Sequence, residues 1–198
     1  MIVEKAIAIF ARDGLGASTR DLAQALGVTQ PLLYRYFPTK DALIERVYHE
    51  VFFRPWNDEW DVWLADRSAG IGDRLKRYLG DYAHFILRGE LVRLHMYAGL
   101  AGNPIVHKFI HSLRERHFRT IAQEIRAEYL LPEPQNEAEA EDEIELIWAA
   151  HSSIFYIGVR QWVYGSPPPP DMARTIDMLV DGFLLGMPAA LRARRAPF

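Results

Sequence analysis

The sequence predicts an all-α protein with a small N-terminal domain, residues 1–48, and a larger helical domain, residues 49–198. Apolar residues recur at helical spacing in almost every segment, and no stretch of useful length alternates between apolar and polar residues as a strand would. Glycine and proline divide the chain into helix-sized pieces, most visibly at 165–170, where Gly-Ser precedes four prolines. We therefore expect about nine helices and no sheet.

Three short helices are expected first. The first runs from Ile2 to Asp13 and ends at Gly14. The second begins at Ser18 or Thr19, whose hydroxyl suits a helix N-cap, and ends at Gly27. The third begins after Thr29 with Pro31 in its first turn, where the missing N–H of proline does no harm.

The rest of the chain is also expected to be helical. A fourth helix follows Thr39 and runs past Val51 to Pro55, and residues 73–89 and 90–101 form two helices or one interrupted helix. A long helix spans about 103–131. Residues 144–164 are apolar on nearly every side, which indicates burial on more than one face. The last helix, 172–187, has one clear apolar stripe, and Gly182 and Gly186 beside it permit close helix approach.

The second and third helices have the spacing of a helix-turn-helix. A small residue, Ala23, lies where two helices would touch, and Gly27 follows four residues later at the corner. The N-terminal side chains of the next helix, Thr29, Gln30 and Leu32, would then point outward, where they can enter a major groove. An ordinary corner between two helices of a bundle explains this spacing equally well.

The residues after the corner favour DNA binding. Tyr34, Arg35, Tyr36 and Lys40 surround a junction between two helices. Hydroxyl donors and cations at a helix N-terminus are typical of groups that grip phosphates.

These first fifty residues resemble the TetR family of bacterial repressors. The resemblance covers Ile2, Ala6 and Phe10 of the first helix, Thr19-Arg20-Asp21-Leu22-Ala23, Gly27-Val28-Thr29, and Leu33-Tyr34-x-Tyr36-Phe37-Pro38-x-Lys40-x-x-Leu43. It implies a dimer that reads a palindromic double-stranded DNA operator, and a helical C-terminal domain that dimerises and holds a small-molecule inducer. One departure is that only Met1 precedes Ile2, where relatives commonly carry a basic arm.

The resemblance also implies roles for single residues. Thr29, Gln30, Pro31 and Leu32 would face bases, whereas Tyr34, Tyr36 and Lys40 would grip phosphates. Arg20 would take either role, and Thr19 and Arg35 complete the expected DNA-binding set. Gln30 is the best candidate for base reading, because its amide can bond N6 and N7 of adenine together.

Composition limits the alternatives without proving DNA binding. The net charge is −3, and residues 1–50 contain six Lys or Arg and six Asp or Glu, so any DNA affinity must come from where the cations lie. Cysteine is absent, which excludes disulfides and thiolate sites. Charged residues interrupt the first helix and no apolar run is long enough to cross a bilayer, so we expect a cytoplasmic protein without a signal peptide or membrane partner.

Aromatic residues beyond position 55 predict an inducer pocket for an apolar or aromatic molecule. Such pockets are mostly apolar with a few polar groups. The predicted pocket residues are Trp60, Trp63, His95, Tyr97, Trp148, His151, Phe155, Arg160 and Trp162. A tightly packed core without a cavity explains most of the same aromatics.

Two other classes of function remain open at this point. One is a helical enzyme that uses histidines and acids, although no catalytic motif supports it. The other is a helical module that binds a protein. His107 and His111 have the spacing of a metal clip, but Lys108 stands where a zinc protease needs glutamate, so neither a metal nor a cofactor is expected.

Overall fold

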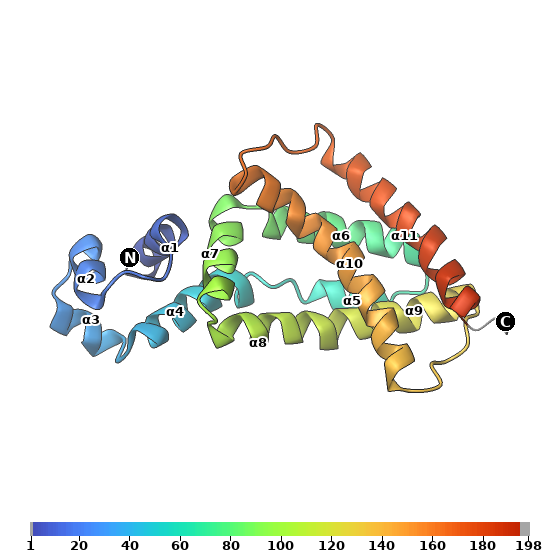
Figure 1. Ribbon diagram of the computed structural model, residues 1–198, viewed down its shortest axis with the longest axis horizontal. Coiled ribbons are helices and arrows are strands. Elements are labelled where there is room, and N and C mark those ends of the chain that lie inside the picture. The colour runs from blue at the N-terminus through green and yellow to red at the C-terminus, as the bar shows by residue number, and fades with distance from the viewer. Residues whose placement is uncertain (1, 195–198) are drawn as a thin grey trace. The chain divides into compact units, whose positions relative to one another are not determined.

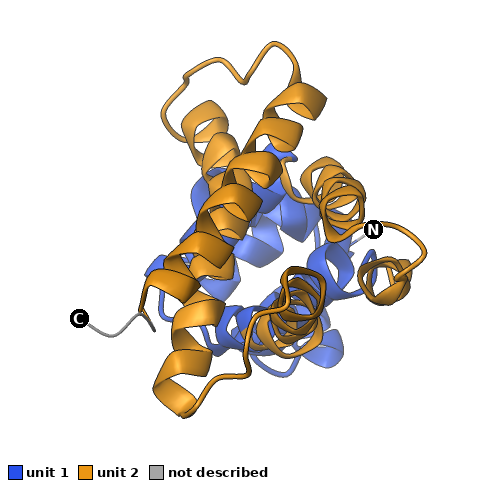
Figure 2. Ribbon diagram, turned by 90° about the vertical axis from the view of Figure 1, so that its right-hand side faces the viewer, with its two compact units in different colours: residues 1–56, 88–110 blue, residues 57–87, 111–198 orange. Residues whose placement is uncertain are grey.

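The computed structural model describes residues 2–194, and this part of the chain is helical with no strand, as predicted (Figure 1). Contacts divide the chain into two compact units. Unit 1 consists of residues 1–56 and 88–110, and unit 2 consists of residues 57–87 and 111–198 (Figure 2).

Unit 1 contains the predicted helix-turn-helix. Its elements are α1 (Ile2–Asp13), α2 (Thr19–Leu26), α3 (Gln30–Tyr36), α4 (Lys40–Tyr48), a π-helical turn η1 (His49–Phe53), α7 (Gly89–Leu100) and most of α8 (Pro104–Leu113). Helix α1 packs against α2, α4 and α7. The buried side chains of α1 include Ala6, Ile9 and Phe10, which are spaced for one helix face.

Helix α7 joins unit 1 through contacts that are distant in sequence. The Nε of Arg93 donates to the carbonyl of Ala11 at 3.1 Å. The ring of Tyr97 lies against Gly14, so close that a Cβ at this glycine would be 3.2 Å from Cδ1 of the ring. Compactness therefore groups residues 88–110 with the N-terminal helices. The domain boundary predicted at residue 48 separates the DNA-binding part from the part that dimerises and holds a ligand, and it stays a prediction.

Aromatic side chains at the end of α4 form a second cluster in unit 1. Tyr48 stacks on Phe52 with ring centroids 4.2 Å apart, and Phe109 contacts both rings. The Tyr48 hydroxyl lies 2.5 Å from Nδ1 of His95. Burial lowers the pKa of His95 to about 4, so the imidazole is neutral at pH 7. Its Nδ1 can then accept a hydrogen bond from the Tyr48 hydroxyl.

Unit 2 is built around α6 (Ile71–Ile86). The other elements are α5 (Glu59–Ala65), a π-helical turn η2 (Arg114–Phe118), α9 (Arg119–Tyr129), α10 (Glu137–Trp162) and α11 (Met172–Arg194). Helix α6 packs against α5, α9, α10 and α11. Its buried stripe of Leu75, Tyr78, Tyr82 and Ile86 has the three-to-four-residue spacing of one helix face.

Two predicted helices differ from the observed ones. The predicted helix over 103–131 is interrupted by the π-helical turn η2, in which His117 and Phe118 are both buried. The last helix continues through Pro188 to Arg194 instead of ending at Met187. Its final turn is held from outside, because Arg192 donates to the carbonyl of Tyr129 at 2.8 Å and Arg194 pairs with Asp142.

Candidate nucleic-acid interface

The corner between α2 and α3 depends on one left-handed residue. Gly27 has φ 73° and ψ 32°, and the next N–H, from Val28, donates to the carbonyl of Ala23 at 3.0 Å. A Cβ at Gly27 would meet only Nζ of Lys5, at 3.9 Å. The glycine is therefore required by its backbone conformation, which other residues adopt at a cost, and not by lack of space.

Hydroxyl side chains cap each helix of the motif. Ser18 caps α2 by accepting from the N–H of Asp21 at 3.1 Å, so the alternative of Thr19 as the cap is wrong. Thr29 caps α3 and Thr39 caps α4, accepting from the N–H groups of Leu32 and Ala42 at 3.3 and 3.0 Å. Thr19 is instead the first residue of α2, and its side chain is left to make other bonds.

The predicted base-facing residues divide by their exposure. Pro31 and Leu32 are exposed, whereas Leu33 is buried against the motif. Thr29 is exposed but uses its hydroxyl in the cap. Gln30 is half-buried, and its Nε2 donates to Oγ1 of Thr19 at 3.2 Å.

Two of the three predicted phosphate-gripping residues, Tyr34 and Lys40, line the same small hollow. Tyr34 and Tyr36 are exposed. Thr19, Tyr34, Thr39 and Lys40 line one small hollow between α2, α3 and the start of α4. The Tyr34 hydroxyl lies 3.0 Å from Oγ1 of Thr19. These hydroxyls and the Lys40 ammonium can therefore meet neighbouring oxygens of one DNA backbone.

Three of the six cations in residues 1–50 are already engaged by protein groups. The guanidinium of Arg12 makes two bonds of 2.7 Å to Asp13, Arg46 pairs with Glu50 at 2.6 Å, and Lys5 donates to the carbonyl of Leu26.

The other three cations are the ones predicted to contact DNA. Among the described residues, Arg20, Arg35 and Lys40 form no ion pair, and Arg20 and Arg35 are exposed. Acids of the same region are neutralised in part, since Glu45 pairs with Lys108 at 2.8 Å. A formally neutral segment thus presents its unpaired positive charge on α2, α3 and the start of α4.

The structure places the predicted pocket residues in different surroundings. His95 and Tyr97 lie in unit 1, and the other seven lie in unit 2. Trp63 is half-buried beneath the guanidinium of Arg77, 3.9 Å from its ring centroid. The exposed Trp162 donates its Nε1–H to the carbonyl of Leu87 at 2.7 Å. Phe155 and Arg160 are half-buried on α10.

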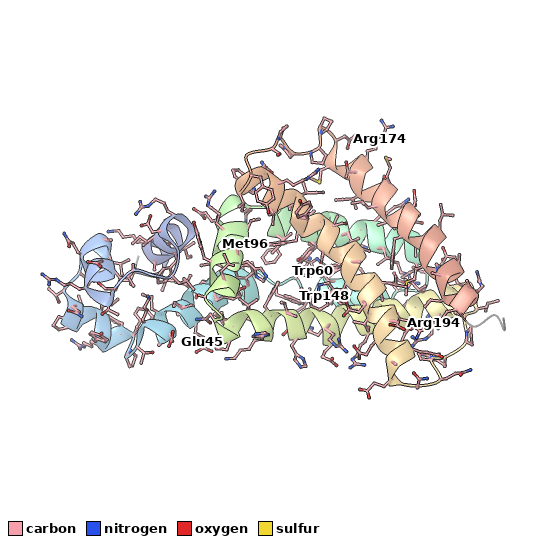
Figure 3. All side chains as sticks on the ribbon, viewed as in Figure 1. Glu45, Trp60, Met96, Trp148, Arg174 and Arg194 are labelled. Atoms are coloured by element: carbon pink, nitrogen blue, oxygen red, sulfur yellow. The ribbon has the colours of Figure 1, made fainter. Side chains whose placement is uncertain are left out.

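Three predicted residues, Trp60, Trp148 and His151, belong to one aromatic cluster in unit 2. Trp60 on α5 is buried and donates its Nε1–H to Asp81 at 2.7 Å, and Trp148 lies on α10 (Figure 3). Phe118 joins the cluster by packing against Trp148 and His151 with ring centroids 5.3 and 5.0 Å apart.

Sequence reasoning missed the polar centre of this cluster. The buried hydroxyl of Tyr78 lies 3.0 Å from Nδ1 of His117 and 3.1 Å from Nε2 of His151. Burial lowers the pKa of His117 to about 4 and that of His151 to about 3, so both rings are neutral at pH 7. The available signal was His117 itself, a polar residue within an apolar stripe.

Two cavities of unit 2 are lined by residues outside the predicted pocket. One, of about 210 Å³, is lined by Leu131, Pro132, Glu139, Glu143, Leu191, Arg192 and Arg194. The other, of about 360 Å³, is lined mainly by polar groups of α9 and by Arg67. The predicted inducer pocket remains a prediction.

No helix of the described residues is long and apolar enough to cross a membrane. Within residues 2–194, no group of three ligand-type side chains converges as a metal site would require. His107 and His111 are both exposed on α8.

Comparison with known proteins agrees with this geometry. Residues 2–47 match the family model described as bacterial regulatory proteins, tetR family. Comparison with proteins of curated function gives no match.

Solved structures share the fold over nearly the whole chain. A TetR-like transcriptional regulator from Rhodococcus sp. RHA1 is 18% identical with a TM-score of 0.66, covering 93% of this chain and 94% of its own. AmtR from Mycobacterium smegmatis is 22% identical with a TM-score of 0.61, covering 99% and 94%. A tetR-family regulator from Streptomyces coelicolor is 22% identical with a TM-score of 0.59, covering 97% and 83%. Residues 2–47 are therefore similar to the N-terminal domain of the tetR family, and nearly the whole chain shares its fold with TetR-like transcriptional regulators.

Proposed function

We propose that this chain is a ligand-responsive repressor that binds a palindromic operator as a homodimer in the cytoplasm. Residues 1–48 would contact DNA, and residues 49–198 would dimerise and hold the inducer. The observation that carries the DNA-binding part is that Arg20, Arg35 and Lys40, around the corner of the helix-turn-helix, form no ion pair with any described residue. Cations in this arrangement neutralise phosphates and release counterions, which supplies sequence-independent affinity.

Gln30 supplies the base contact in this proposal. It is the first residue of α3, the helix that would enter the major groove, and an amide at this place can bond adenine at N6 and N7. Tyr34, Tyr36 and Lys40 would hold the phosphates on either side. Replacing Gln30 with alanine should cost about 1–3 kcal/mol at one base pair and leave the other positions unchanged.

A salt titration of DNA binding tests the cation assignment. Fluorescence anisotropy would follow a duplex from the region upstream of the chain's own coding sequence. Arg20→Ala, Arg35→Ala and Lys40→Ala should each weaken binding to all sequences and lower the slope of log K against log salt by about one. Arg12→Ala is the matched control, because Arg12 is exposed but already bonded to Asp13. Equal slopes for all four variants and the parent would show that this face does not contact DNA.

The exposed faces of α10 and α11 support a homodimer. Met178, Gly182, Leu185 and Gly186 form an exposed stripe on α11, opposite the buried stripe that includes Ile176, Val180 and Leu184. Met178 is 64% and Leu185 79% exposed.

On α10, Tyr156 is exposed as well, and Val163 follows at the end of the helix. Two packed helices that each expose apolar groups bury them when a second copy forms a four-helix arrangement.

Light scattering tests the dimer with variants that do not disturb the core. Leu185→Arg should give a monomer, because it places a charge in the proposed interface, and Gly186→Arg should do the same by steric bulk. A Cβ at Gly186 meets no atom within 4 Å, so the folded monomer has room for the new side chain. Ala173→Arg is the matched control, because Ala173 is exposed in the first turn of α11 and lies about 120° or more around the helix from the exposed stripe. A dimer that survives the arginines at 185 and 186 would place the interface elsewhere.

We also propose that the inducer is a small apolar or aromatic molecule held within the larger domain. The support is the aromatic cluster of Trp60, Phe118 and Trp148 with neutral histidines among its rings. Apolar burial contributes about 25 cal/mol per Å², so an aromatic ligand gains most from such walls. A screened compound should quench tryptophan fluorescence and release operator DNA over the same concentration range. A compound that quenches tryptophan fluorescence without releasing operator DNA would show that the protein binds it but is not induced by it.

A further inference from the structure

Thr19 lies between two residues that are predicted to contact DNA. Its Oγ1 accepts a hydrogen bond from Nε2 of Gln30 at 3.2 Å and lies 3.0 Å from the hydroxyl of Tyr34. Gln30 and Tyr34 are four residues apart and therefore share one face of α3. Because Ser18 and not Thr19 caps α2, the Thr19 hydroxyl can make both contacts.

The hydrogen bond to Thr19 does not compete with base reading. A glutamine amide has two N–H donors and one carbonyl acceptor. Thr19 takes one N–H, which leaves one N–H and the carbonyl. Adenine needs that remaining pair, because its N7 accepts and its N6 donates.

The two hydroxyls also leave one hydrogen for DNA. Thr19 and Tyr34 carry one hydroxyl hydrogen each, and their mutual bond uses one of them. Whichever hydroxyl donates, the other keeps a hydrogen that can point to a phosphate oxygen, which only accepts. The pair therefore works as a single phosphate donor while it holds the amide of Gln30.

We propose that Thr19 is a positioning residue that sets the base preference of Gln30 by orienting its amide before DNA arrives. This inference rests on the proposed DNA-binding function. Without Thr19, the glutamine side chain must be ordered when DNA binds, and ordering such a side chain costs affinity. The loss falls mainly on the base pair that Gln30 reads, because Arg20, Arg35, Lys40 and the hydroxyl of Tyr34 are unchanged.

Selection of preferred sequences from a random duplex pool tests the proposal with three variants. Thr19→Val keeps the shape and removes the oxygen, Thr19→Ser keeps the oxygen, and Gln30→Ala marks the base pair concerned. Thr19→Val should reduce the preference at that same base pair by about 3- to 10-fold, and Thr19→Ser should retain it. Tyr34 keeps its own hydroxyl hydrogen for a phosphate in both variants, so affinity for random DNA should fall less than the preference at that base pair. A Thr19→Val protein that keeps the full preference, or loses it at another base pair, overturns the proposal.

A measurement on the free protein separates this inference from the proposed function. The side-chain amide signals of Gln30 in a ¹H–¹⁵N spectrum are assigned by their loss in Gln30→Ala. They should shift in Thr19→Val and stay in place in Thr19→Ser. Unshifted signals in Thr19→Val overturn the positioning role, whatever the DNA result. If the parent selects no sequence, the proposed function fails, and the spectrum still decides whether Thr19 holds Gln30.

Discussion

At the scale of single residues, the helix-turn-helix depends on one backbone angle and on which charges remain unpaired. Gly27 turns the chain in a conformation that side-chain-bearing residues adopt only at a cost. The charges matter because residues 1–50 are formally neutral, yet Arg20, Arg35 and Lys40 form no ion pair within the part of the chain that the structure describes. The placement of cations, and not their number, makes this surface suitable for DNA.

Replacing Gly27 with alanine should destabilise the protein by about 1–2 kcal/mol, because φ is positive there. Urea unfolding measures the change. Gly16→Ala is the matched control, since a Cβ at Gly16 meets no atom within 4 Å and its φ is not left-handed. Equal unfolding free energies for the two variants would contradict the role given to the corner.

At the scale of elements, three helical segments of unit 2 meet at one buried hydroxyl. Tyr78 on α6 bonds His117 on η2 and His151 on α10. Nε2 of His117 also lies 3.3 Å from Asp61 on α5. Buried polar groups cost free energy when they lose their partners, so this network fixes how the helices pack.

Tyr78→Phe should therefore lower the free energy of unfolding by about 1–3 kcal/mol, because two ring nitrogens lose their shared partner. Thermal or urea unfolding gives the value. Tyr156→Phe removes a hydroxyl from an exposed ring and should leave stability unchanged in the monomer. An unchanged free energy of unfolding in Tyr78→Phe would mean that the histidines find other hydrogen-bond partners.

Stability should also fall as the pH is lowered from about 6.5 toward 4. Burial lowers the pKa of His117 to about 4 and of His151 to about 3, whereas both histidines titrate near 6.5 when unfolded. In this window the unfolded chain binds more protons than the folded protein. Each histidine therefore lowers the free energy of unfolding by up to about 1.4 kcal/mol for each pH unit. Above pH 7 the contribution is constant. His151→Gln should flatten the slope measured by urea unfolding, and an unchanged slope would contradict the assignment.

Periodicity and helix-breaking residues predicted most of the helices, though not α5, and also the corner and the caps at Thr29 and Thr39, because these features depend on neighbours in sequence. The π-helical turns were not predictable, since a one-residue change of register leaves no mark in composition. The contacts of Arg93 with Ala11 and of Tyr78 with His151 were missed for a different reason. They join residues far apart in the chain, and only the folded structure shows them.

At the scale of the whole molecule, DNA recognition in the proposed function requires two copies of the helix-turn-helix. Two chains related by a two-fold axis present two α3 helices, and such dimers read half-sites separated by about one helical turn. The chain shares its fold with a TetR-like transcriptional regulator over nearly its whole length.

A nuclease footprint on the DNA upstream of the chain's own coding sequence tests the central claim most directly. We expect a protected segment containing an inverted repeat, with half-site centres about 10 base pairs or a multiple apart. The footprint should disappear at raised salt, and it should weaken in Lys40→Ala while persisting in Arg12→Ala. Protection without an inverted repeat, or equal protection by Lys40→Ala and the parent, would contradict the claim that paired copies of this helix-turn-helix read the DNA.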